Sequence, residues 1–182
     1  IIDAAQGDVD RWVRSGEWRK DIPYTAKCYY RLYKFGDMHR LIAAYESMLR
    51  EYGSMKEYVR SHASTGIEAV SAICRYFAEH DASTVVPRNT QSACKRVCMF
   101  LRWMVRSGSP VDLGLWADII DRRTLIMPLD THVVQEALRL GLLKSRTASM
   151  ATARRLTDAM LEVFPDDPLR GDFALFGLGV DE

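Results

Sequence analysis

The chain has 182 residues, of which 48% are hydrophobic and 27% charged, and its formal net charge at pH 7 is +1. This composition excludes a disordered or fibrous protein, and the near-zero charge excludes a global field that would attract nucleic acid or an anionic membrane. Affinity for a polyanion must therefore come from a local patch. The length is typical of one domain, and we predict a single domain over residues 1–182.

The cysteines and the apolar stretches bear on the cellular location of the protein. Cys28, Cys74, Cys94 and Cys98 lie in helical patterns without a preceding signal peptide, which is typical of reduced thiols. No apolar stretch approaches the roughly 20 residues that cross a bilayer. We therefore expect a soluble, cytoplasmic protein without disulfides or membrane contact. Residues 1–5 look like the interior of a helix, so we expect that further residues precede them in the full-length protein.

Helical periodicity dominates the first half of the chain. An apolar series follows Asp37 and stops at Gly53, which predicts a helix over residues 38–52. Two capping boxes predict helices over 55–62 and 66–80, each with a hydroxyl residue three positions before a glutamate: Ser54 with Glu57, and Thr65 with Glu68. Residues 81–89 have a loop composition.

Helices are also predicted through the second half. Residues 90–107 carry one apolar stripe, a short helix is expected over 113–120, and Pro128 argues against a central strand in the apolar run 125–129. Asp130 is placed to cap a helix that Gly141 ends, followed by a helix over 148–164 and a last one beginning at 167–168. Strand patterns with a period of two are absent, so we predict an all-α fold.

A local basic surface is predicted on the helix over 90–107. Lys95, Arg102 and Arg106 are spaced by seven and four residues, which places them on one side of a helix, opposite the apolar stripe. Arg88 and Arg96 add to them, and no acidic residue lies between residues 82 and 111. Such a face is suited to phosphates, although a basic helix face exposed to solvent needs no ligand.

Two further features have competing interpretations. Cys94 and Cys98 share one helix face, but zinc needs about four ligands and no second pair is suitably spaced, so we predict buried thiols and no metal site. Asp130 opens a helix after an apolar run. It needs no function as a helix cap, yet a carboxylate held there can also act as a general base or stabilise a cationic transition state.

The sequence resembles a known superfamily at several of these positions. Residues 126–133, Ile-Met-Pro-Leu-Asp-Thr-His-Val, are similar to the segment that carries the catalytic aspartate of helix-hairpin-helix base-excision DNA glycosylases. Residues 138–142, 162–165 and 173–177 look like the C-terminal half of that superfamily. Residues 50–54, 92–96, 99–106 and 111–114 resemble a functionally uncharacterised bacterial family related to these glycosylases, so the resemblance spans most of the chain.

The resemblance implies a DNA-repair enzyme without a cofactor. Asp130 would be catalytic and Lys95 a candidate nucleophile. Asp130 alone could also serve a monofunctional glycosylase, by positioning water and stabilising the cationic sugar. The basic residues Arg88, Lys95, Arg96, Arg102 and Arg106 would contact DNA, while Trp103, Trp116 and Phe176 would line a pocket for a flipped base. The alternative is a module that kept the fold and binds nucleic acid or a protein without chemistry.

Two departures from the superfamily concern the hairpin and the lysine. The interval before Asp130 that should hold a glycine-rich hairpin turn reads Asp-Ile-Ile-Asp-Arg-Arg-Thr over residues 118–124. In a divergent archaeal 8-oxoguanine glycosylase branch, the lysine lies on a helix similar to 90–107, at a position that aligns near Cys98. Lys95 would present its amine at a different angle from that position.

Overall fold

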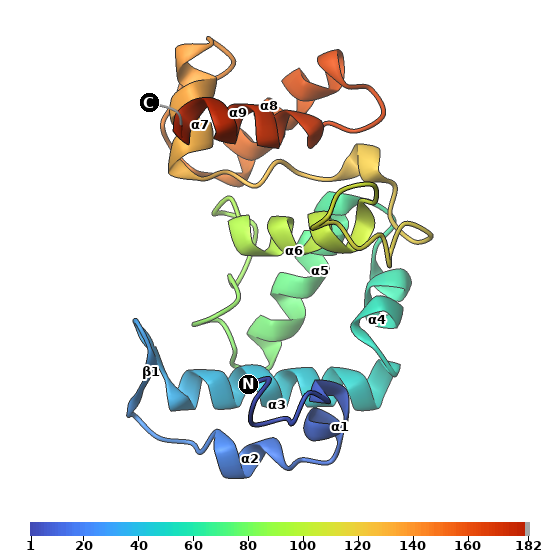
Figure 1. The fold of residues 1–182 in the computed structure, drawn as a ribbon, viewed down its shortest axis with the longest axis vertical. Coiled ribbons are helices and arrows are strands. Elements are labelled where there is room, and N and C mark those ends of the chain that lie inside the picture. The colour runs from blue at the N-terminus through green and yellow to red at the C-terminus, as the bar shows by residue number, and fades with distance from the viewer. Residues whose placement is uncertain (181–182) are drawn as a thin grey trace. The chain divides into compact units, whose positions relative to one another are not determined.

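The computed structural model describes residues 1–180, apart from the side chains of Phe176 and residues 178–180. Helices account for most of the regular structure, as the all-α prediction requires at this coarse level (Figure 1). The expectation that strands are absent is wrong at one place, where β1 (Cys28–Tyr30) pairs antiparallel with β2 (Tyr33–Lys34). Strands this short carry no visible period of two.

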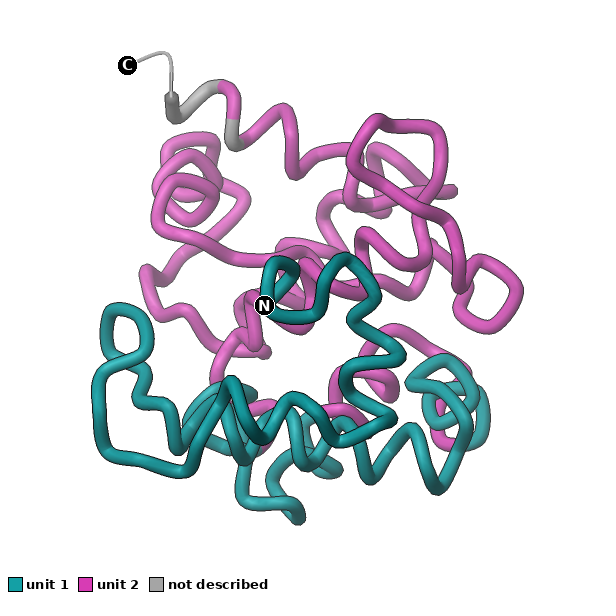
Figure 2. The backbone as a smooth tube through the Cα atoms, turned by 60° about the horizontal axis from the view of Figure 1, so that its bottom comes forward, with its two compact units in different colours: residues 1–61, 74–88 teal, residues 62–73, 89–182 magenta. Residues whose placement is uncertain are grey.

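The described chain divides into two compact units, coloured separately in Figure 2. The first unit holds residues 1–61 and 74–88, and the second holds residues 62–73 and 89–182. Helix α5 (Gly66–Glu79) contributes residues to both. A single domain over residues 1–182 therefore stays a prediction.

The first unit is built on α3 (Phe35–Tyr52), with α1 (Val9–Arg14), α2 (Trp18–Asp21) and α4 (Met55–His62). A buried cluster that includes Trp12, Trp18, Ile42 and Leu49 forms its core. Helix α3 starts earlier than predicted because Asp37 caps it from inside the first turn, where its carboxylate accepts the Lys34 amide at 2.8 Å. It ends before Gly53, whose φ of +78° suits glycine, as predicted.

Both predicted capping boxes precede the helices that they were expected to start. Ser54 Oγ accepts the Glu57 amide at 3.1 Å, and α4 begins at Met55. The Glu68 carboxylate accepts the Thr65 amide at 3.1 Å, and α5 begins at Gly66. These local signals are short-range, so the sequence alone locates them well.

The second unit contains α6 (Lys95–Val105), the 3-10 turn η1 (Arg122–Thr124), α7 (Thr131–Arg139), α8 (Met150–Val163) and α9 (Arg170–Val180). Helices α7 and α9 pack side by side (Figure 1). The buried run 125–129 leads into α7 and has no regular secondary structure, which confirms that no central strand forms there.

Two predicted helices of this unit were wrong in extent or kind. Helix α6 begins at residue 95 rather than 90 because Cys94 has a left-handed φ of +47° and the Ala93 amide donates to the Ala148 carbonyl instead. Residues 113–120 form turns, since the Leu113 and Trp116 amides donate to carbonyls of α6 at 2.7 Å each. These partners lie outside the predicted helix, where local periodicity cannot detect them.

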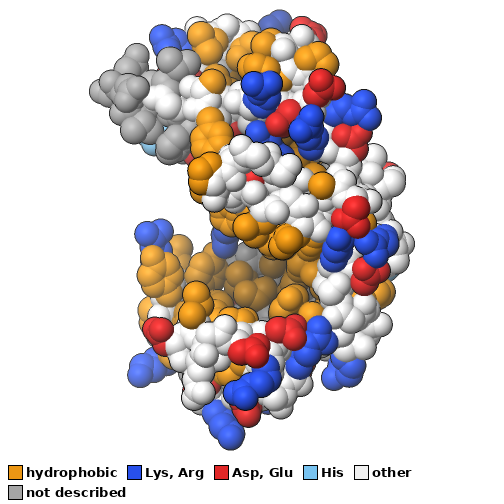
Figure 3. Space-filling view, turned by 45° about the vertical axis from the view of Figure 1, so that its right-hand side comes forward, with side chains coloured by type: hydrophobic (Ala, Val, Ile, Leu, Met, Phe, Trp, Pro, Cys, Tyr) orange, Lys and Arg blue, Asp and Glu red, His pale blue; other side chains and the backbone are white. Residues whose placement is uncertain are grey.

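The surface carries charges of both signs. Figure 3 shows Lys and Arg side chains intermingled with Asp and Glu on the face drawn. Within residues 1–180, no helix is long and apolar enough to cross a membrane.

Candidate functional site

The buried segment 125–129 fixes the position of Asp130. On one side, the Met127 amide donates to Thr157 Oγ1 on α8 at 2.9 Å. On the other, the Gly66 amide at the start of α5 donates to Thr124 Oγ1 at 2.8 Å. A Cβ on Gly66 would lie 2.3 Å from the Thr124 carbonyl oxygen, so only glycine allows this approach. The segment is thus held from both sides just before it reaches Asp130.

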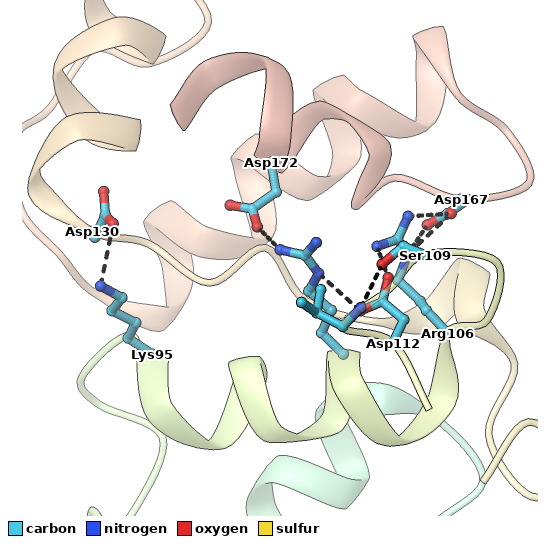
Figure 4. A network of polar contacts seen from close by, with 9 residues as sticks. Lys95, Arg106, Ser109, Asp112, Asp130, Asp167 and Asp172 are labelled. Atoms are coloured by element: carbon cyan, nitrogen blue, oxygen red, sulfur yellow. Dashed lines mark hydrogen bonds and ion pairs between the residues drawn. The ribbon is translucent and has the colours of Figure 1, made fainter. Parts of the chain in front are cut away.

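Asp130 uses its two carboxylate oxygens differently. Oδ1 accepts the Val133 amide at 2.9 Å, which confirms the predicted cap of α7. Oδ2 lies 3.2 Å from Lys95 Nζ, and the two residues are 35 positions apart in the sequence (Figure 4). The structure therefore brings together the two residues that the sequence singled out as catalytic candidates.

Lys95 reaches Asp130 because the start of α6 is anchored. An isolated bridge between Ser92 and Ser149 and the hydrogen bond from Ala93 to Ala148 join the approach to α6 to the start of α8. Lys95 is the first residue of α6, so its side chain leaves the helix at this fixed end. Cys98, near which the sequence resemblance would place a lysine, is buried one turn further along.

The Lys95–Asp130 pair is asymmetric in exposure. The Lys95 side chain is 47% exposed, whereas that of Asp130 is 18% exposed. Burial alone would raise the pKa of Asp130, but the Val133 amide and Lys95 outweigh it and hold the pKa below its ordinary value. Asp130 is therefore an anion at neutral pH, beside an amine that solvent reaches.

The pair lies in the wall of an open pocket of about 400 Å³. Apolar groups come from Leu129, Val134 and Ala148, and polar groups from Thr131, Gln135 and Arg146, in addition to the pair itself. Thr131, Val134 and Gln135 share one face of α7, as their spacing of three and four residues requires. An apolar pocket with a few convergent polar groups is typical of small-ligand sites.

Beyond Lys95, the basic side of α6 differs from its prediction. Arg102 and Arg106 do share that side, but they are buried, with side chains 2% and 9% exposed. Arg102 pairs with Asp172 and, at 3.5 Å, with Asp112. Arg106 pairs with Asp112 at 2.7 Å and with Asp167 at 2.9 Å (Figure 4). The expectation that Arg102 and Arg106 face DNA phosphates is therefore wrong.

The partners of these arginines explain the error. Asp112, Asp167 and Asp172 all lie outside the acid-free stretch 82–111, and the fold brings them onto α6. The basic residues Lys95, Arg102 and Arg106 lie along α6 with Asp130 and these three aspartates, and we call this set the α6 charge row. Of the three basic side chains in this row, only that of Lys95 is substantially exposed.

The α6 charge row also separates the pKa values of two carboxyl groups. Burial raises the pKa of Asp172, and the nearby Asp130 carboxylate raises it further, against the opposing effect of Arg102. The pKa values of Asp130 and Asp172 are therefore shifted in opposite directions, although both carboxylates face α6. Arg102 also stacks on the ring of Phe173, with its guanidinium carbon 4.0 Å from the ring centroid.

Comparison with known proteins places the chain in a family. Residues 1–181 match the family described as protein of unknown function (DUF2400). The chain belongs to this family. The search of curated proteins and the search of solved structures gave no match.

The other two basic residues that were predicted to bind nucleic acid, Arg88 and Arg96, are exposed in this DUF2400 protein. Arg96 lies on α6 beside Lys95, and Arg88 is the last residue of the first unit. Their role in binding nucleic acid stays a prediction. Arg146, which the sequence did not single out, lies in the pocket wall instead. It comes from the loop between α7 and α8, where no periodicity ranks one residue above another.

The three aromatic residues expected around a flipped base have different places. Trp116 is buried and packs edge-on against Phe100, with ring centroids 5.3 Å apart, so it belongs to the core. Trp103 is exposed, and neither tryptophan is among the described residues that line the pocket. The side chain of Phe176 lies outside the described residues.

The cysteine prediction is confirmed where it concerns burial. Cys94 and Cys98 are both buried, and burial raises the pKa of the Cys98 thiol to about 12. Cys98 is therefore an unreactive core residue. Among the residues that the structure describes, no group of three or more His, Cys, Asp or Glu side chains could hold a metal ion.

Proposed function

We propose that this protein is a divergent base-excision DNA glycosylase in which Asp130 and Lys95 act on the sugar of a damaged nucleotide. The observation that carries this proposal is the 3.2 Å contact between Lys95 Nζ and Asp130 Oδ2 in the pocket wall. Its support from the sequence is the resemblance of residues 126–133 to the aspartate segment of helix-hairpin-helix glycosylases. The fold of that superfamily is part of the proposal.

Each member of the pair has a role in this chemistry. As the bond from C1′ to the base breaks, its electrons leave with the base and positive charge develops on the sugar. The Asp130 carboxylate, ionised at neutral pH, stabilises that charge. Lys95 Nζ can then release a proton to Asp130 and form a bond to C1′. When the C1′–O4′ bond breaks, its electrons and a second proton of the nitrogen go to O4′. The sugar ring opens, and an imine that borohydride can reduce is left between Lys95 and C1′.

The pocket suits a base taken out of the DNA stack. Its volume of about 400 Å³ lies within the range of small-ligand sites, and Leu129 and Val134 offer apolar contact. Gln135 carries both a donor and an acceptor, which can pair with the edge of a base. Work on DNA agrees with the cytoplasmic location that we expect from the sequence.

A second candidate is a nucleic-acid-binding module that has lost the chemistry. It is favoured by the second use of Asp130, whose Oδ1 caps α7 through the Val133 amide. A carboxylate with this structural use is retained whether or not it is catalytic.

The two candidates are separated by an excision assay. Duplexes carrying a panel of damaged bases are incubated with wild type, Asp130→Asn and Lys95→Ala, with sodium borohydride present in parallel samples. The glycosylase proposal predicts excision of at least one base, a trapped covalent adduct, and loss of both in Lys95→Ala. Binding without excision of any base by the full-length protein would support the second candidate and overturn the first.

A further inference from the structure

The hairpin of the first unit has an unusual composition. Residues 22–36 contain five aromatic and three basic side chains and no acidic one. The basic residues Lys27, Arg31 and Lys34 are all exposed. This segment comprises the hairpin β1–β2 and its flanking residues. Because the charges of the whole chain nearly cancel, the segment is a local concentration of cationic and aromatic side chains.

Hydrogen bonds and packing hold the base of this hairpin. The Phe35 amide donates to the Lys27 carbonyl at 2.9 Å, and the Gly36 amide donates to the Thr25 carbonyl at 2.8 Å. Tyr29 packs edge-on against Phe35, with ring centroids 5.0 Å apart. Both strands contact α3, from whose start the hairpin projects in Figure 1. The tip therefore projects from a base that is held against α3.

The tip exposes side chains that usually lie inside a protein. Leu32 is 94% exposed and Tyr30 is 58% exposed. Between them, Arg31 has a left-handed φ of +52°, which glycine or asparagine would adopt with less strain. Arg31 also lies over the Tyr30 ring, with its guanidinium carbon 5.2 Å from the centroid. The tip therefore retains a strained cation beside an exposed ring and an exposed aliphatic group.

We propose that the hairpin tip is a nucleic-acid contact, in which Lys27, Arg31 and Lys34 bind phosphates and Tyr30 and Leu32 pack against bases. The three cations complement a polyanion, and every base offers a face on which an aromatic ring can stack. An anionic membrane has the same charge, but its binding scales with buried apolar area, and the tip offers Leu32 as its one aliphatic side chain.

This proposal is independent of excision chemistry. It concerns undamaged nucleic acid and residues of the first unit, whereas the proposed active site lies in the second. Failure of one therefore leaves the other standing. A protein that binds through the hairpin but excises nothing would retain this inference and lose the glycosylase proposal.

The test measures binding of the full chain to fluorescent single-stranded DNA and to a duplex of the same sequence, over a range of salt concentrations. The triple variant Lys27→Gln, Arg31→Gln, Lys34→Gln is compared with a matched triple variant of exposed residues elsewhere in the first unit: Lys20→Gln, Arg50→Gln, Arg60→Gln. We expect the hairpin variant to lose about tenfold or more in affinity and the slope of log affinity against log salt to fall by about two to three. The control should change little.

Two further variants separate stacking and stability from charge. Tyr30→Ala with Leu32→Ala should weaken binding about tenfold while leaving the salt slope unchanged, because no charge is removed. Arg31→Gly relieves the left-handed φ, so it should raise the melting temperature and still weaken binding. A variant that is more stable but binds less well excludes misfolding as the cause.

Three results would contradict a nucleic-acid contact at the hairpin tip. No binding to either DNA, or equal losses in the hairpin and control triple variants, would contradict the proposal. Binding to phosphatidylserine–phosphatidylcholine vesicles that depends on Leu32, without DNA binding, would assign the tip to a membrane surface instead.

Discussion

The two ends of the α6 charge row contain the same chemistry in different surroundings. At one end, Arg102 and Arg106 are buried and pair with three aspartates, of which Asp112 contacts both arginines. At the other, Lys95 is half-exposed and meets Asp130 beside a pocket. Buried ion pairs are costly to break, whereas exposed ones contribute little to stability. The arginine end therefore stabilises the fold, whereas the Lys95 end is accessible to a ligand.

The largest effect is expected at the buried end. Arg102→Met removes the cationic partner of the buried Asp172 carboxylate, while Asp112 loses one of its two arginine partners and keeps Arg106. We expect the free energy of unfolding, measured by urea titration, to fall by about 3–5 kcal/mol. A loss as small as that of an exposed pair would contradict a structural role for the arginine end.

The next effect concerns the support of Asp130. Gly66→Ala places a Cβ against the Thr124 carbonyl oxygen, so the segment that leads to Asp130 must shift. We expect a destabilisation of about 1–3 kcal/mol together with reduced excision. Gly53→Ala is a useful control, because no atom lies within 4 Å of its added Cβ and only its positive φ is strained.

The capping and charged functions of Asp130 can be separated next. Asp130→Ala removes the cap of α7 and should cost about 1 kcal/mol, whereas Asp130→Asn retains a good capping side chain. Excision should be lost in both variants, because the amide cannot stabilise a cation as a carboxylate does. Full excision by Asp130→Asn would limit Asp130 to its structural role.

Lys95 provides the sharpest contrast with Arg102. Lys95→Gln removes only a half-exposed partner, so the unfolding free energy should change by less than about 1 kcal/mol. Excision should nevertheless be abolished. Lys144→Gln, on an exposed loop of the same unit, is the matched control and should change neither quantity.

The smallest effect is a pH dependence of opposite sign at the two carboxyl groups. The pKa of Asp130 is lowered on folding, so its stabilisation is present above its ordinary pKa of about 4 and is lost as the pH falls through the folded value. The pKa of Asp172 is raised, so its contribution is present at low pH and is lost as the pH rises through the folded value.

Urea titrations of the two asparagine variants at several pH values test this difference. From neutral pH towards pH 3, the advantage of wild type over Asp130→Asn should shrink, and the advantage over Asp172→Asn should grow. The same trend in both variants would show that the two ends of the α6 charge row do not differ electrostatically.

The sequence predicted the parts of this molecule that depend on neighbouring residues. The caps at Ser54, Thr65 and Asp130 and the stop at Gly53 each involve groups within a few positions of one another. The spacing of Lys95, Arg102 and Arg106 also placed them correctly on one side of α6. These predictions succeeded because helix geometry relates such residues directly.

What failed depends on partners that are distant in the sequence. Periodicity could not show that Asp167 and Asp172 cover the arginines, and it therefore assigned a buried face to solvent. The segment 113–120 has helical spacing, but its amides bond to α6. The hairpin β1–β2 was missed because its strands are too short to show alternation. Of the pocket, the sequence named only Lys95 and Asp130, while Gln135 and Arg146 emerged from the fold.

The difference between the two ends of the α6 charge row is tested most directly by identifying the amine that bonds to the sugar. The protein is incubated with a duplex from which it excises a base, and the covalent adduct is trapped with borohydride. The adduct is then digested, and the modified peptide is sequenced by mass spectrometry. Our account predicts that the adduct lies on Lys95, the one basic residue of the α6 charge row with a half-exposed side chain beside a pocket. An adduct on any other amine, or undiminished trapping in Lys95→Gln, would contradict it.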